Sequence, residues 1–99
     1  MRITEYEKQV IVEAVASFDT DAPVYLFGSR ADDTKKGGDI DIAILSSKIA
    51  WKDQSALYWK IADRIGEQKI DIAVFQDENK PFYRLAKQTG LLLNDGVVH

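Results

Sequence analysis

Residues 26–45 read LFGSRADDTKKGGDIDIAIL, and this stretch decides how the rest of the chain is interpreted. An apolar run turns at Gly28-Ser29, and a polar loop then leads into an apolar strand that carries Asp39 and Asp41. Side chains two residues apart on a strand point to the same face. Aspartate is unfavourable in strands, so this pair needs a reason other than folding. The stretch therefore predicts a metal-dependent site that handles phosphate.

Hydrophobic spacing on either side of this stretch predicts helices. Apolar residues recur every three to four positions over residues 5–18, behind a capping box that begins at Thr4, and again over residues 54–66. Pro81 suits the first position of a last helix, which is expected to bury Phe82, Leu85 and Ala86. The chain is thus expected to contain three helices.

Short apolar runs at residues 24–27, 40–45 and 69–75 predict strands, and Val97-Val98 predicts a short edge strand. The predicted fold class is α/β (α+β), a small mixed β-sheet with helices packed on one face. The IDIAIL run at residue 40 matches the IDIAVF run at residue 70 almost position for position. This repetition places Asp71 on the same side of the sheet as Asp41 if the two strands are neighbours.

Three converging carboxylates, Asp39, Asp41 and Asp71, would repel one another unless a cation lay among them. Their hard oxygen atoms suit Mg²⁺ or Mn²⁺. Gly28 lets the backbone approach an anion, and Ser29 and Arg30 offer a hydroxyl and a guanidinium to phosphate oxygens. Such an arrangement is typical of phosphoryl and nucleotidyl transfer. Lys69 and Arg84, in contrast, are interpreted as ordinary surface charge.

Composition narrows the class of protein. The 99 residues predict a single domain over residues 1–99, and 45% hydrophobic with 29% charged residues is ordinary for a soluble globular chain. A formal charge of −3 argues against general nucleic-acid binding, and the absence of cysteine excludes disulfides. No signal peptide or membrane-spanning run is recognised, so a cytoplasmic location is expected.

The order of these features resembles the nucleotidyltransferase superfamily that includes DNA polymerase beta. Gly28-Ser29, nine intervening residues, Asp39-Ile40-Asp41 and a later Asp71 follow the family signature over nearly the whole chain. In size the chain is most similar to the minimal nucleotidyltransferases, the MntA-like antitoxins paired with HEPN-domain toxins. This chain has Asp32 where many family members have arginine.

The resemblance implies a role for each matching residue. Gly28 and Ser29, with Arg30 beside them, would hold the phosphates of ATP, whereas Asp39 and Asp41 would bind the metal ions. Asp71 would complete the metal site and help to activate the attacking hydroxyl. The implied reaction transfers AMP from ATP to a hydroxyl, with a tyrosine of a partner HEPN toxin as the acceptor.

Two other functions are compatible with the same residues. One is a non-catalytic antitoxin that binds its partner and retains only a nucleotide site. The other is transfer to a small molecule such as an aminoglycoside, for which a homodimer could build the acceptor pocket. Trp51 and Trp59 could contribute to a partner-binding surface, because aromatic side chains are frequent at interaction hot spots.

Overall fold

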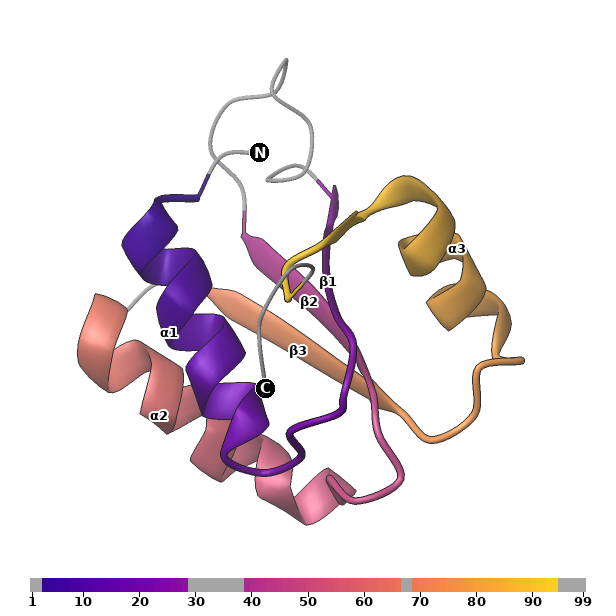
Figure 1. The fold of residues 1–99 in the computed structure, drawn as a ribbon, viewed down its shortest axis with the longest axis horizontal. Coiled ribbons are helices and arrows are strands. Elements are labelled where there is room, and N and C mark those ends of the chain that lie inside the picture. The colour runs from indigo at the N-terminus through magenta and orange to yellow at the C-terminus, as the bar shows by residue number, and fades with distance from the viewer. Residues whose placement is uncertain (1–2, 29–38, 67–68, 95–99) are drawn as a thin grey trace.

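The computed structural model describes residues 3–28, 39–66 and 69–94. Its elements follow one another along the chain in this order: α1 Glu5–Ala16, β1 Val24–Phe27, β2 Ile40–Leu45, the 3₁₀ turn η2 Trp51–Asp53, α2 Gln54–Ile65, β3 Ile70–Phe75, α3 Pro81–Thr89 and β4 Leu91–Leu92. The three predicted helices and the three predicted strands within this part of the chain are all present. Figure 1 shows their arrangement.

The capping box predicted at the start of α1 is confirmed. The Thr4 hydroxyl accepts a hydrogen bond from the backbone N–H of Glu7 at 3.0 Å, and the Glu7 carboxylate accepts one from the Thr4 N–H at 2.8 Å. These bonds satisfy two backbone donors that a helix start otherwise leaves without a partner. They fix where α1 begins.

The sheet has the strand order β3-β2-β1-β4. Strands β2 and β3 are parallel, whereas β1 runs antiparallel to both β2 and β4. A parallel pair needs a crossover, and α2 supplies it between β2 and β3. The mixed sheet and the α+β class are confirmed.

Helices α1 and α2 cover one face of the sheet, and Figure 1 shows them side by side on the same side of the strands. The isoleucines of β2, Ile40, Ile42 and Ile44, are fully buried against them. Because side chains alternate along a strand, burying the isoleucines turns the other set of β2 residues to the opposite face. That set includes Asp41.

Helix α3 packs on this opposite face. Its Tyr83 and Ala86 are buried against Tyr25 of β1 and Ala43 of β2. The expectation of helices on one face therefore holds for α1 and α2 but not for α3. The second face carries its own apolar residues toward the far end of β2 and β3, and these also need a cover.

The buried side of α3 differs in part from the one predicted, because Ala86 is buried as expected but Phe82 and Leu85 are not. Phe82 and Leu85 are 50% and 56% exposed, whereas Tyr83 is only 2% exposed. The helix ends at Gly90, after which Leu91 and Leu92 form β4 beside β1. Apolar or aromatic residues occupy more than one side of this short helix, so its sequence does not specify which side faces the sheet. The predicted strand at Val97-Val98 lies outside the described residues.

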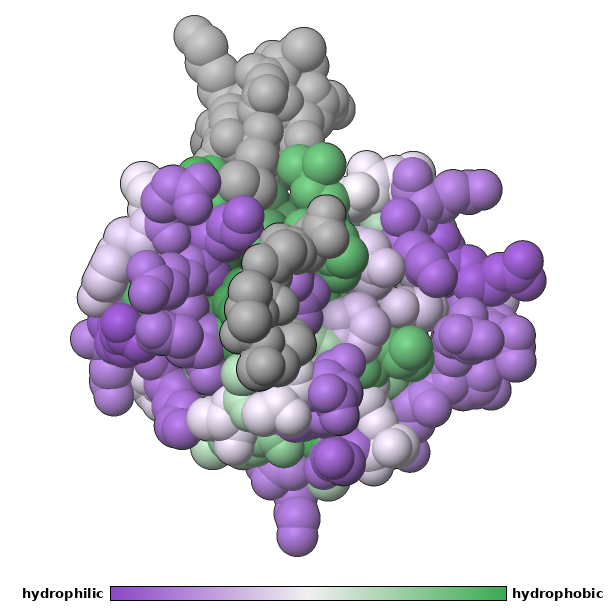
Figure 2. Space-filling view, in the orientation of Figure 1, coloured by the Kyte–Doolittle hydropathy of each residue, from purple (hydrophilic) through white to green (hydrophobic). Residues whose placement is uncertain are grey.

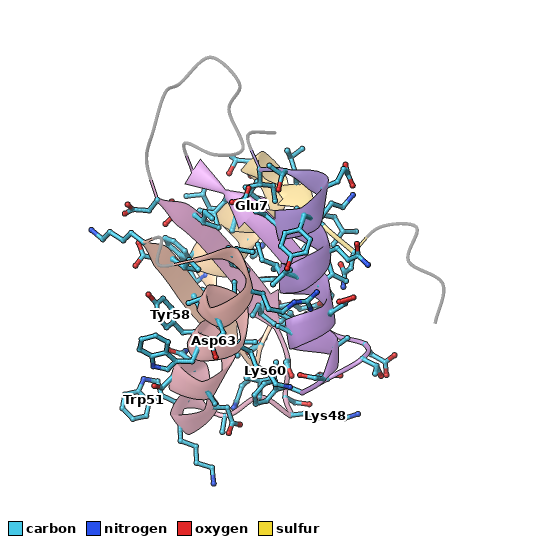
Figure 3. The ribbon with its side chains drawn as sticks, turned by 90° about the vertical axis from the view of Figure 1, so that its left-hand side faces the viewer. Glu7, Lys48, Trp51, Tyr58, Lys60 and Asp63 are labelled. Atoms are coloured by element: carbon cyan, nitrogen blue, oxygen red, sulfur yellow. The ribbon has the colours of Figure 1, made fainter. Side chains whose placement is uncertain are left out.

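The outer surface of α2 carries aromatic side chains. Trp51 of the preceding η2 turn and Trp59 of α2 are 83% and 50% exposed. Tyr58 is half-buried and forms an edge-to-face contact with Trp59 at 5.2 Å between ring centroids. Figure 3 shows Trp51 and Tyr58 on the same side of α2. Among the described residues, no helix is long and apolar enough to cross a membrane.

Candidate active site

The parallel register of β2 and β3 brings the three predicted aspartates together. Asp41 lies directly opposite Asp71, and Asp39 precedes Asp41 by two residues on the same face. Each aspartate offers one carboxylate oxygen, and these oxygens all lie within 4.8 Å of one another. The spatial convergence that the matching strands predicted is therefore present in the fold.

The cluster is an electrostatically costly arrangement centred on Asp41. Burial raises the pKa of the Asp41 carboxyl above 3.8, and the nearby charges and hydrogen-bonding capacity of Asp71 and the charge of Asp39 raise this pKa further. Like charges disfavour ionisation, so the carboxylates of Asp71 and Asp39 make Asp41 easier to protonate. A bound cation would offset the repulsion among these carboxylates.

Lys69 is a charged neighbour that the sequence interpretation missed. Its ammonium nitrogen lies 3.6 Å from Oδ2 of Asp39, and its charge partly offsets the raised pKa of Asp41. Lys69 precedes β3 as Asp39 precedes β2, and the Ile40 N–H donates to the Lys69 carbonyl at 3.0 Å. The signal was available in the sequence, because residues that precede two matched parallel strands lie side by side.

Gly28 is a glycine for two independent physical reasons. Its φ angle is +72°, a region that side chains other than glycine rarely occupy. A Cβ atom at this position would also lie 2.5 Å from Oδ2 of Asp41. The turn after β1 therefore brings bare backbone against the carboxylate cluster, and a side chain at this position would force the Asp41 carboxylate to move.

The donor set fits a divalent metal ion. All three groups are carboxylates, which supply the hard oxygen ligands that Mg²⁺ and Mn²⁺ prefer. Asp39 and Asp41 are half-buried, whereas Asp71 is exposed. An ion held by these residues would be anchored on its protein side and reachable by substrate on the other.

Part of the predicted nucleotide site cannot be placed. Ser29 and Arg30, together with Asp32, lie outside the described residues. Their predicted contacts with phosphate remain predictions. Gly28 is the one residue of the predicted phosphate-binding group that falls within the described part of the chain.

The family model described as polymerase beta, nucleotidyltransferase matches residues 9–95. This match covers most of the chain and includes the glycine turn and all three aspartates. The chain belongs to the polymerase beta nucleotidyltransferase family. No curated protein matches it closely enough to count as a relative.

Membership in the nucleotidyltransferase family agrees with the arrangement of the described residues. The family chemistry places nucleotide phosphates near acidic residues that can hold a metal ion, and the face bearing Asp39, Asp41 and Asp71 offers such a place. The function is therefore of the nucleotidyltransferase type. The individual role of each aspartate remains a prediction.

Proposed function

We propose that this protein transfers AMP from ATP to a tyrosine hydroxyl of a partner HEPN-domain toxin and thereby acts as its antitoxin. The reaction would take place in the cytoplasm and require Mg²⁺ or Mn²⁺. The observation that carries the proposal is the convergence of Asp39, Asp41 and Asp71 beside the bare backbone of Gly28.

In the proposed reaction, the acceptor oxygen forms a bond to the α-phosphorus of ATP. The bond between that phosphorus and the oxygen bridging to the β-phosphate breaks, and pyrophosphate leaves. A divalent ion, when bound, would neutralise charge on the phosphates and make the acceptor hydroxyl easier to deprotonate. The reaction balances in atoms and charge when a base accepts the proton of the acceptor hydroxyl.

In the proposal, the Asp71 carboxylate accepts this proton. Its carboxylate is exposed, whereas Asp39 and Asp41 are half-buried, so a hydroxyl on another protein can approach Asp71 most directly. Asp39 and Asp41 would hold the triphosphate in position through the metal ion. Gly28 would allow the phosphates to lie close to the backbone, because no side chain stands in the way.

The acceptor is proposed to be a protein because the described chain offers little enclosure around the carboxylates. Asp71 is exposed and lies on β3, an edge strand of the sheet. An open site of this kind suits an acceptor that brings its own surface. The reaction class itself is compatible with other hydroxyl acceptors.

The test uses ATP labelled on either the α- or the γ-phosphate. The protein is incubated with Mg²⁺ and the product of the neighbouring reading frame, which we expect to be a HEPN-domain protein, and any labelled product is mapped to a modified residue. We expect α-label, but not γ-label, on a tyrosine of the partner. EDTA should abolish the transfer.

Asp39→Asn and Asp41→Asn should each lower the rate about 100-fold or more, the scale expected when one group that stabilises a transition state is lost. Asp63→Asn is the matched control, because Asp63 is exposed on α2, which covers the other face of the sheet (Figure 3). Wild-type rates in both site variants would refute the proposed site. A stable complex without label would indicate a binding antitoxin, and label on an added aminoglycoside instead would indicate a small-molecule transferase.

A further inference from the structure

Phe82 is an exposed aromatic side chain that the fold holds in place. Half of the residue is exposed, yet its ring meets Phe27 edge-to-face at 5.4 Å and stacks on Phe75 at 5.9 Å between centroids. Its orientation is therefore determined by packing rather than by solvent.

The two ring contacts locate Phe82 relative to the carboxylates. Phe27 lies opposite Asp41 in the β1–β2 register, and Phe75 lies opposite Leu45 near the other end of β2. A ring that reaches both must lie over the middle of this face. That position is about two residues along the strands from Asp41, or roughly 7 Å.

Small side chains follow the carboxylates along β2 and β3. Two alanines, Ala43 of β2 and Ala73 of β3, lie opposite each other between the carboxylates and Phe75. Short side chains here allow α3 to pack close to the sheet, because its Tyr83 and Ala86 are buried against Ala43. Phe82, the residue before Tyr83, is thereby held near the carboxylates.

The surroundings argue against a broad protein-docking surface at this point. The outer side of α3 carries the exposed polar residues Arg84, Lys87 and Gln88, and Figure 2 shows mainly hydrophilic side chains over this helix. Interface cores are depleted of charged residues. A single fixed aromatic ring with polar neighbours suits a small planar ligand better than a protein partner.

We propose that Phe82, supported by Phe27, is the platform on which the nucleobase of the substrate stacks while its triphosphate lies at the aspartates. This inference rests on the proposed nucleotidyltransferase site. Stacking on an aromatic ring is possible for every base, because each base has a π-face. The platform therefore binds nucleotides without strong discrimination between their bases.

The test compares binding of Mg·ATP with binding of Mg·tripolyphosphate, which has the phosphates but no base, by isothermal titration calorimetry. Phe82→Leu keeps an apolar side chain but removes the ring, and Phe82→Trp keeps a ring. Leu85→Ala is the matched control, because Leu85 is similarly exposed on α3 and forms no ring contact. Thermal unfolding of each variant establishes that the fold is retained.

We expect Phe82→Leu to weaken ATP binding by about 5- to 100-fold, the range that corresponds to one base–aromatic stack, and to leave tripolyphosphate binding unchanged. Phe82→Trp should bind ATP at least as tightly as the wild type, and Leu85→Ala should bind both ligands normally. Unchanged ATP binding in Phe82→Leu, or equal losses for both ligands, would overturn the platform while leaving the carboxylate site intact. Failure of the wild type to bind either ligand would overturn both proposals.

Discussion

Replacement of Asp41 by asparagine should stabilise the metal-free protein and abolish its stabilisation by metal. The side chain of Asp41 is half-buried, and carboxylate oxygens of Asp39 and Asp71 lie within 4.8 Å of it. The substitution removes one charge from two repulsive pairs and keeps the size of the side chain. The carboxamide can also donate a hydrogen bond to a remaining carboxylate.

The size of the effect follows from the distances. Two unit charges 4.8 Å apart repel by about 0.9 kcal/mol in water and by about 3.5 kcal/mol at an effective dielectric constant of about 20. The exposure of Asp71 and the nearby Lys69 cation favour the lower value for each pair. Two pairs then contribute about 1 to 2 kcal/mol, which corresponds to a rise in Tm of roughly 5 to 15 °C for a domain of this size.

The assay is thermal unfolding followed by circular dichroism, in EDTA and in increasing Mg²⁺ near neutral pH. At a Mg²⁺ concentration of about 100 times Kd, the wild type should gain about 2.7 kcal/mol, whereas Asp41→Asn should gain little. The order of stability of the two proteins should therefore invert between EDTA and Mg²⁺. Asp63→Asn should follow the wild type in both conditions.

The same substitution should change how the free energy of unfolding depends on pH in EDTA. Because the pKa of Asp41 is raised in the folded state, the folded protein binds more protons than the unfolded chain between pH 3.8 and the raised value. The free energy of unfolding contributed by this group therefore falls as pH rises through that window. The advantage of Asp41→Asn should grow through the same window and disappear below pH 3.8.

Two results would refute this reasoning. An Asp41→Asn protein that is no more stable than the wild type in EDTA would show that the carboxylates do not repel as their separation implies. A variant that retains the full rise in Tm with Mg²⁺ would show that Asp41 is not needed to hold the ion.

Three further substitutions test the fold around the site. Gly28→Ala should lower the free energy of unfolding by about 1 to 2 kcal/mol, because alanine is strained at this positive φ angle. The substitution should also reduce nucleotidyl transfer, because the added Cβ would displace the Asp41 carboxylate. Equal activity of the variant and the wild type in a transfer assay would contradict the second expectation. Ser46→Ala should cost about 1 to 3 kcal/mol in urea denaturation, since the Ser46 hydroxyl donates to buried Asp19 at 2.6 Å and accepts from the Ile49 N–H at 3.0 Å. Thr4→Ala should cost about 1 kcal/mol by the same measurement through loss of the α1 cap, and a Thr4→Ser control should cost less.

Local patterns in the sequence predicted most of the elements. The capping box at Thr4, the helical spacing of α2 and the alternation in β2 and β3 depend on contacts between residues close in the chain or on a strict period of two. The repeated Ile-Asp-Ile-Ala segment also predicted that Asp41 and Asp71 would meet. Here the sequence was informative because identical patterns in parallel strands align without a shift in register.

The packing of α3 could not be predicted in this way. The choice between burying Phe82 with Leu85 and burying Tyr83 with Ala86 depends on which surface of the sheet receives the helix. That surface is formed by Tyr25 and Ala43, from two other strands, so no pattern within residues 81–89 contains the information. Lys69 is different, because the matched strands that follow Asp39 and Lys69 already indicate that these two residues lie side by side.

The sequence by itself determined that two matching strands would each carry an aspartate beside buried isoleucines, and that a glycine turn would precede the first of them. These features follow from side-chain alternation and from the conformational freedom of glycine. The tertiary structure alone decided that the Gly28 backbone lies so near Asp41 that a Cβ would meet its carboxylate, and that Phe82 remains exposed on the same face of the sheet. Each of these depends on distances between separate strands and helices, which are set by the packing of the whole core.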